Sequence, residues 1–184
     1  RISSINSISA LCETTGADIR DVSLAIGTDK RIGKYFLNAG PGFGGSCFKK
    51  DILNLVYICN HYGLDEVSSY WEKVIDINQW QQKRISSLVV DKLFGTLFNK
   101  KISILGFSFK ADTNDTRESP AINICSDLTE EGANLHIFDP KVSEEKINND
   151  LKNKTNSKNI DWVVSKSIED CINDSHAIVI ITEW

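Results

Sequence analysis

Apolar residues recur at helical spacing through the first hundred positions of the chain. Ile2, Ile5 and Ile8 are three residues apart, which places them on one face of a helix. Asp18 is a suitable N-cap for a second helix, and Gly27 is a suitable terminator. The pattern predicts four helices, which cover residues 2–11, 18–27, 46–61 and 66–98.

The pattern changes at Lys100, after which short apolar runs replace the helical spacing. These runs do not alternate with polar residues, so they indicate strands buried on both faces of a parallel sheet. Ser119 and Ser167 are suitable helix starts between the strands, and the polar stretch 141–160 indicates a surface connection. Strands are expected at residues 102–106, 135–139, 162–164 and 177–181.

This order of elements predicts an α/β protein with two parts. A helical domain is followed by an incomplete doubly wound, Rossmann-like parallel sheet of the kind that binds nucleotides.

Composition narrows the classes of function. The chain has 184 residues, and its net charge of -4 argues against nucleic-acid binding, which usually requires a basic stripe. Its apolar runs are shorter than the ~20 residues that a membrane-spanning helix needs, so we expect no membrane partner. None of the five cysteines forms a C-x-x-C pair, and we predict no metal site. Their odd number and wide spacing favour reduced thiols in a cytoplasmic protein.

One cysteine lies in a distinctive chemical context. Cys47 follows a glycine-rich loop and precedes a predicted helix in the run GFGGSCFKKD. Backbone N–H groups and the helix dipole at such a position stabilise a thiolate, which is the nucleophilic form. Asp51 lies one turn later on the same face, where a carboxylate can activate water. A cysteine near a helix is more often a small buried hydrophobe, the role expected for Cys12, Cys59, Cys125 and Cys171.

The run GFGGSCFKKD closely resembles the active-site signature of the UDP-glucose/GDP-mannose dehydrogenase family. The resemblance covers most of the chain in the family's order, except residues 141–160, which match poorly. It extends over the runs RISSINSISALCE, RIGKYFLNAGPGFGGSCFKKDILNLVY, KKISILGFSFKADTNDTRES and LHIFDPKV.

The resemblance implies a protein of three domains, of which this chain is a part. Residues 1–99 would be the central helical dimerisation domain with the catalytic cysteine. Residues 100–184 would be the UDP-sugar-binding domain, truncated at its end. The N-terminal NAD-binding domain would lie outside these 184 residues, so we expect the chain alone to be inactive.

The activity that the resemblance implies is the oxidation of UDP-glucose to UDP-glucuronate by two molecules of NAD. Cys47 would form a thiohemiacetal and then a thioester, and Asp51 would help to activate the water that releases the acid. The cofactor-side positions of the family carry over to Lys50 and Arg117. The substrate-binding positions carry over to Arg31, Phe36, Asn38, Ala39, Gly40, Pro41, Gly42, Phe43, Gly44, Phe109 and Lys110.

The letters from Gly40 to Gly45 also spell the dinucleotide motif G-x-G-x-x-G. No buried strand precedes them, and no acidic residue ends a second strand ~20 residues later. We interpret the match as accidental, which agrees with NAD being bound mainly by the absent domain.

The resemblance also implies partners. These are UDP-glucose and a second copy of the chain that docks along the long helix at 66–98, with a hexamer as a further possibility.

Three alternatives stay open. The parent protein could be a dehydrogenase of GDP-mannose or of a UDP-amino sugar. The chain alone could be a non-catalytic dimerising and nucleotide-sugar-binding module. An unrelated cysteine hydrolase would need a histidine base, and His61, His136 and His176 have no recognisable triad context.

Overall fold

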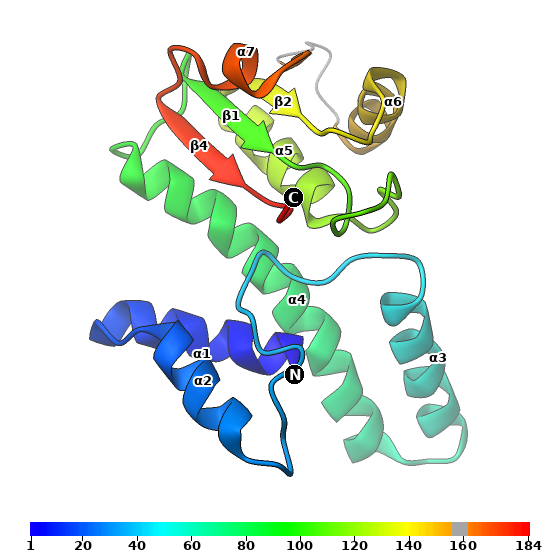
Figure 1. Cartoon of the computed structure of the whole chain (residues 1–184). Helices are drawn as coiled ribbons and strands as arrows, with labels where there is room; N and C mark the ends of the chain where they lie inside the picture. The colour runs from blue at the N-terminus through cyan, green and yellow to red at the C-terminus, as the bar shows by residue number, and fades with distance from the viewer. Residues whose placement is uncertain (156–161) are drawn as a thin grey trace. The chain divides into compact units, whose positions relative to one another are not determined.

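The structure is a computed structural model, and it describes residues 1–155 and 162–184 (Figure 1). The chain forms two compact units. The first unit contains residues 1–42 and 50–81, and the second contains residues 43–49 and 82–184. The helix α3 and the long helix α4 each contribute residues to both units.

The first unit is helical, as the spacing of its apolar residues predicts. Helix α1 covers Ile2–Thr15 and helix α2 covers Ile19–Thr28. The predicted cap at Asp18 is confirmed, because its carboxylate accepts a hydrogen bond of 2.8 Å from the backbone N–H of Arg20. The buried apolar side chains of this unit are those of Ile5, Cys12, Leu37, Val56, Cys59 and Ile75.

Helix α3 covers Phe48–His61, and helix α4 covers Asp65–Lys92. The sequence predicted that α4 would continue to Phe98, which is wrong by about two turns. Phe94 and Gly95 both have positive φ angles, 63° and 80°. The N–H of Gly95 donates to the carbonyl of Val90 at 2.9 Å. This left-handed turn closes the helix, because it satisfies a carbonyl that would otherwise lack a partner.

The second unit contains a parallel sheet of four strands in the order β3-β2-β1-β4. Its central strand β1 pairs with β2 from Lys101↔Asn134 to Leu105↔Phe138. The predicted strands are confirmed within one residue at each end. The strands are β1 (Lys101–Leu105), β2 (Asn134–Phe138), β3 (Trp162–Val164) and β4 (Ala177–Ile180).

Two predicted helix starts between the strands are also confirmed. Helix α5 covers Pro120–Glu130 and is capped by Ser119, whose hydroxyl accepts from the N–H of Ala121. Helix α7 covers Ile168–Ile172 and is capped by Ser167. In both cases a hydroxyl satisfies an N–H group that the first helical turn leaves unpaired.

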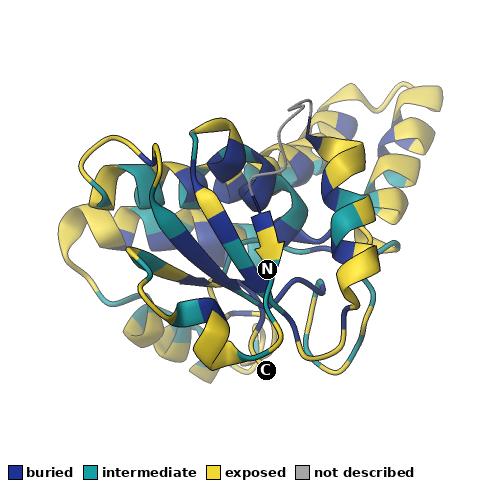
Figure 2. Cartoon of the chain, turned by 90° about the horizontal axis from the view of Figure 1, so that it is seen from above, coloured by how far each residue is buried: buried dark blue, intermediate teal, exposed yellow. Residues whose placement is uncertain are grey.

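Both faces of the central strand are covered. Ile102, Ser103 and Ile104 are consecutive and fully buried, although successive side chains of a strand point to opposite faces. Ser103 donates to the carbonyl of Cys171, which connects its face to α7. Figure 2 shows the buried residues gathered along the strands and the helices beside them. The near-continuous apolar pattern of β1 therefore has the cause that the sequence suggested. The expectation is wrong for β4, an edge strand in which Ile178 and Ile180 are 50 % and 68 % exposed.

The stretch 141–160 differs from the expected surface connection. Residues Glu144–Lys154 form helix α6, whose N-cap is Ser143. Ile147 and Leu151 are one turn apart and buried in the core, and Asn148 accepts a hydrogen bond from the indole N–H of Trp162 at 2.8 Å. The abundance of Asn, Lys and Glu obscured this helix, because only two apolar residues mark its buried face. Residues 156–160 of the stretch lie outside the described part of the chain.

Over residues 1–155 and 162–184 no helix combines the length and apolar character needed to cross a bilayer. The same residues contain no group of three or more His, Cys, Asp or Glu side chains arranged to hold a metal ion.

Candidate active site

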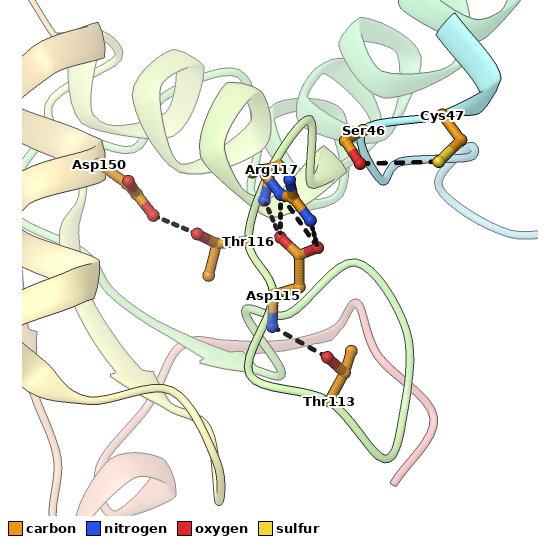
Figure 3. Close-up of polar contacts among 7 residues, drawn as sticks. All are labelled: Ser46, Cys47, Thr113, Asp115, Thr116, Arg117 and Asp150. Carbon is orange, nitrogen blue, oxygen red and sulfur yellow. Dashed lines mark hydrogen bonds and ion pairs between the residues drawn. The ribbon is translucent and has the colours of Figure 1, made fainter. Parts of the chain in front are cut away.

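Cys47 is the one exposed cysteine of the five, and it lies directly before the first residue of α3. Cys12, Cys59, Cys125 and Cys171 are buried, as expected for packing residues. Burial raises the pKa of the Cys125 thiol and of the Cys171 thiol, which keeps both in the unreactive protonated form. The side chain of Ser46 is the neighbour of Cys47, with Oγ 3.7 Å from Sγ (Figure 3).

The glycines before Cys47 lie against the loop that follows β1. The N–H of Gly45 donates to the carbonyl of Arg117 at 2.8 Å. A Cβ atom on Gly44 would lie 2.5 Å from the carbonyl oxygen of Glu118 and 2.9 Å from the Cβ atom of Phe109. Gly45 has a φ of 85°, and a Cβ atom there would meet the ring of Phe109 at 3.0 Å. Glycine is therefore required here for close backbone approach as well as for conformation.

An ion pair reinforces this contact. The ammonium group of Lys49 donates to a carboxylate oxygen of Glu118 at 2.9 Å. Glu118 has a φ of 54°, an uncommon backbone conformation for a residue other than glycine. The resemblance did not assign either residue to the site. The run of glycines was the one sequence signal that another part of the chain approaches closely here.

Arg117 is held by its neighbour Asp115. The guanidinium donates to both carboxylate oxygens, and the shortest of these hydrogen bonds is 2.7 Å (Figure 3). This pairing lowers the pKa of Asp115 and is the main reason that the pKa of Arg117 is raised. Cys47 makes the smallest contribution to the raised pKa of Arg117, which shows that its side chain lies near the guanidinium.

The other predicted residues on this loop are Phe109 and Lys110. The ammonium group of Lys110 lies over the ring of Phe109, 5.5 Å from its centroid. Phe43, Gly44, Cys47, Phe109, Lys110 and Arg117 are the predicted site residues that belong to the second unit.

A carboxylate outside the predicted site shapes the same loop. Asp139 follows β2 and is buried. One oxygen accepts from the N–H groups of Phe107 and Ser108, at 2.6 Å and 3.0 Å. The other accepts from those of Lys141 and Val142, at 2.8 Å and 2.9 Å. In many dinucleotide-binding folds an acid at this position binds a ribose, but here both oxygens already hold the backbone.

The remaining predicted residues lie in the first unit. Arg31 is exposed and forms a paired contact with Asp29 at 2.6 Å. Phe36 is exposed, with a φ of 63°. Lys50 and Asp51 are exposed in the first turn of α3. The segment Asn38, Ala39, Gly40, Pro41 and Gly42 has no regular secondary structure.

Two side chains hold that segment at Gly40. Its N–H donates to the side-chain oxygen of Asn6 at 2.9 Å, and its carbonyl accepts from the amide of Gln81 at 2.9 Å. Asn6 and Gln81 are almost fully buried, at 1 % and 2 % exposure. The segment is therefore an ordered loop. No described strand precedes Lys101, so the letters G-x-G-x-x-G at residues 40–45 do not follow a strand, as predicted.

Two domain profiles of one family match the chain. The central domain of the UDP-glucose/GDP-mannose dehydrogenase family matches residues 1–80, and the UDP binding domain of that family matches residues 103–184. Together these matches leave only residues 81–102 uncovered.

Curated relatives are similar over the whole chain. The UDP-glucose 6-dehydrogenase of Bos taurus is 56 % identical over 189 residues, covering 100 % of this chain and 38 % of the relative. That of Drosophila melanogaster is 50 % identical over 190 residues, covering 100 % and 40 %. The chain thus spans about two fifths of the length of these relatives.

A solved structure has the same fold. The UDP-glucose dehydrogenase of the archaeon Pyrobaculum islandicum superposes with a TM-score of 0.87 at 30 % identity, covering 100 % of this chain and 40 % of that one. A GDP-mannose dehydrogenase from Pseudomonas aeruginosa superposes with a TM-score of 0.67 at 23 % identity, covering 100 % and 41 %. The second likeness, at this identity, is one of fold alone.

Proposed function

The chain belongs to the UDP-glucose/GDP-mannose dehydrogenase family, and from this membership we propose that it is part of an enzyme that oxidises UDP-glucose to UDP-glucuronate. The substrate is proposed from the curated relatives, which are named UDP-glucose 6-dehydrogenases. A dehydrogenase of GDP-mannose or of a UDP-amino sugar is the rival within the family.

The observation that carries the proposal is the environment of Cys47. The thiol of Cys47 is exposed, whereas the other four cysteines are buried. It lies at the start of a 14-residue helix. At that position the thiol lies beside the N–H groups that the first helical turn leaves unpaired. The contacts of Gly45 and Lys49 with the Arg117–Glu118 segment hold the loop around it. An exposed thiol on a positioned loop is suited to covalent catalysis.

The proposed chemistry uses the chain's own residues at the aldehyde stage. The Sγ atom of Cys47 bonds to the aldehyde carbon, and the aldehyde oxygen takes up a proton to complete a thiohemiacetal. Oxidation of this adduct leaves a thioester. Asp51 removes a proton from water, the water attacks the thioester carbon, and the carbon–sulfur bond breaks to release the acid and the thiolate. Two molecules of NAD, when bound in turn, would each accept one hydride, the first from the primary alcohol and the second from the thiohemiacetal.

The residues proposed for the cofactor are Lys50 and Arg117. The guanidinium of Arg117 is 66 % exposed although it is paired with Asp115, so it fits a role as a contact for a cofactor phosphate. Asp139 does not fit a ribose contact, since its oxygens already accept four N–H groups. These residues therefore support a contact to a cofactor phosphate but not to a ribose. We propose that another domain binds most of the cofactor.

The proposed substrate residues are the eleven that the resemblance implies, from Arg31 and Phe36 through the loop 38–44 to Phe109 and Lys110. Backbone N–H groups of glycine-rich loops suit phosphate oxygens. We further propose a cytoplasmic homodimer, or a hexamer of such dimers, that associates along α4. Val67, Tyr70 and Trp80 of this helix are between 44 % and 66 % exposed, which supports such an interface.

Activity of the full-length parent protein tests the function. With UDP-glucose and NAD we expect NADH formation that is abolished by Cys47→Ser and retained by Cys59→Ala, a substitution at a buried cysteine. Faster oxidation of GDP-mannose or of a UDP-amino sugar would instead support the rival. Full activity of the Cys47→Ser variant would exclude covalent catalysis by this residue.

The thiol chemistry can be tested on the 184-residue chain. We expect an aromatic disulfide reagent to modify Cys47 rapidly and the four buried cysteines only after unfolding. A Cys47→Ser variant should show no rapid phase. Rapid modification of a second thiol would contradict the assignment of Cys47 as the one accessible nucleophile.

A second function, supported by the match of the UDP binding domain to residues 103–184, is nucleotide-sugar binding without turnover. Calorimetric titration of the chain with UDP-glucose tests it. Heat of binding without NADH formation would identify a non-catalytic module. If no heat of binding is measured, the binding of UDP-glucose would depend on segments of the parent protein outside this chain.

A further inference from the structure

A buried hydrogen bond connects the loop after β1 to α6, and the chemistry proposed for Cys47 does not use it. Thr116 is fully buried, although exposed residues follow it in that loop. Its hydroxyl donates to a carboxylate oxygen of Asp150 at 2.5 Å (Figure 3). The side chain of Asp150 is 15 % exposed. Buried polar pairs that are satisfied in this way rigidify the segments that they connect.

Asp150 belongs to a helix that is anchored in the core of the second unit. Ile147 and Leu151 of α6 are 0 % and 1 % exposed and belong to that core. The second carboxylate oxygen of Asp150 accepts from the ammonium group of Lys146, one turn earlier, at 2.6 Å. The carboxylate is therefore held in place, and it offers the loop after β1 a fixed acceptor.

The two residues after the buried threonine contact the chain on both sides of Cys47. The carbonyl of Arg117 accepts from the N–H of Gly45 at 2.8 Å. The carboxylate of Glu118 pairs with the ammonium group of Lys49 at 2.9 Å. The thiol therefore lies on a short segment whose two ends are held by the loop after β1.

Contacts inside this loop cannot anchor it. Arg117 and Asp115 are two residues apart, so their paired hydrogen bonds move with the loop. Glu118 has a φ of 54°, a conformation that costs free energy and persists only where its surroundings impose it. The bond from Thr116 to Asp150 reaches a different element, 34 residues away in the chain. It therefore supplies an anchor two residues before the strained position.

The residues proposed to contact the substrate on the same loop are held by other bonds. The N–H of Phe109 donates to the carbonyl of Asp115 at 3.0 Å. The carbonyl of Lys110 accepts from the hydroxyl of Ser108 at 2.8 Å. Neither bond involves Asp150, so its loss should displace the thiol more than the substrate contacts.

We propose that Asp150 is a positioning residue for the Cys47 thiol. Its hydrogen bond with Thr116 fixes the segment that holds the chain on both sides of the thiol, and so fixes where Sγ meets the aldehyde carbon. The inference rests on the covalent catalysis proposed for Cys47. Misplacing a reacting group by about 1 Å can cost up to about a hundredfold in rate.

The mobility of the chain at Cys47 tests the anchoring without any turnover. A thiosulfonate spin label should attach to this exposed cysteine in the folded 184-residue chain while the other four stay buried. Electron paramagnetic resonance then reports motion of the label on the nanosecond scale, on which loops move. We expect Thr116→Val, which removes the hydroxyl but keeps the branched shape, to shift the spectrum towards a mobile component.

Further variants separate the hydrogen bond from general effects on folding. Thr116→Ser keeps the hydroxyl and should keep the spectrum of the unaltered chain. Asp150→Ala should mobilise the label as Thr116→Val does, and the double variant no more than either, because both changes break the same bond. Lys152→Ala is the matched control, since Lys152 is exposed on the same helix. Circular dichroism checks that each variant folds.

Turnover by the full-length parent protein measures the consequence for catalysis. We expect Thr116→Val and Asp150→Ala to lower kcat about tenfold and to change KM for UDP-glucose less than about twofold. Thr116→Ser and Lys152→Ala should retain the kcat of the unaltered enzyme. Because kcat is expressed per mole of folded protein, a purely structural role of the bond would leave it unchanged.

Three results would overturn the proposal. These are equal label mobility in Thr116→Val and the unaltered chain, a loss of kcat that Thr116→Ser does not restore, and unchanged kcat in Asp150→Ala while Cys47→Ser is inactive. Full activity of Cys47→Ser would instead overturn the proposed covalent catalysis. The label mobility would still decide whether Asp150 anchors the loop.

Discussion

The ammonium nitrogen of Lys49 lies 2.9 Å from a carboxylate oxygen of Glu118, although 69 residues separate the two in sequence. Their side chains are 36 % and 48 % exposed, so the pair contributes less than about 1 kcal/mol to stability. Its consequence is mainly positional, because Lys49 belongs to the first turn of the helix that follows Cys47.

The Lys49–Glu118 pair predicts a small, salt-sensitive coupling. Lys49→Ala and Glu118→Gln should each lower the free energy of unfolding by less than about 1 kcal/mol, and the double variant should cost no more than either single variant. Urea unfolding at low and high salt measures both effects. Fully additive losses would show that the two side chains do not interact in solution.

The contact of Gly44 with the second loop predicts a larger effect. Gly44→Ala would place a Cβ atom 2.5 Å from the backbone oxygen of Glu118, which cannot move aside as a flexible side chain could. We expect a loss of about 2 kcal/mol in the free energy of unfolding. Gly40→Ala is the control, because its Cβ atom would meet nothing within 4 Å. Equal stability of the two variants would contradict the close approach.

Asp139 predicts a stability effect without a catalytic role. In Asp139→Asn an amide group replaces one of the two oxygens, so two of the four backbone N–H groups lose their acceptor in a buried site. We expect a loss of about 3 kcal/mol in the free energy of unfolding. Asp91→Asn, at an exposed position of α4, should change it by less than about 0.5 kcal/mol. Chemical denaturation of both variants makes the comparison.

The pairing of Asp115 with Arg117 predicts a dependence of stability on pH. Hydrogen bonds from the guanidinium lower the pKa of Asp115 below its usual value of 3.8. A carboxylate with a depressed pKa contributes stability above the unfolded pKa and loses that contribution as the pH falls through the folded pKa.

The unaltered chain should therefore exceed Asp115→Asn in stability near neutral pH, by no more than about 1 kcal/mol. The difference should shrink as the pH is lowered from 4 towards the depressed pKa. Unfolding by urea between pH 7 and pH 3 measures it. A difference that stayed constant over this range would show that the pair does not form in solution.

The sequence alone determined most of the local structure, because that structure depends on spacing and on single side chains. The apolar runs predicted all four described strands, and the capping residues Asp18, Ser119 and Ser167 were identified correctly. The run GFGGSCFKKD singled out Cys47 and led to the correct family. The errors of the sequence prediction were also local. Helix α6 was missed because it has only two buried apolar residues, and the length of α4 was overestimated because a left-handed turn at Phe94 and Gly95 ends it early.

Only the tertiary structure decided which distant residues meet. No spacing in the sequence places Lys49 against Glu118 or Gly44 against Phe109, since 65 or more residues separate each pair. Asp139 resembled a ribose ligand by position, yet the packed loops direct four N–H groups at its oxygens and give it a structural role. An open cavity lined by Arg117, Lys141 and Lys146 likewise exists only because the sheet brings the segments after β1 and β2 to one edge. Periodicity and capping act between neighbours along the chain, whereas a site is made by the parallel alignment of strands that are far apart in it.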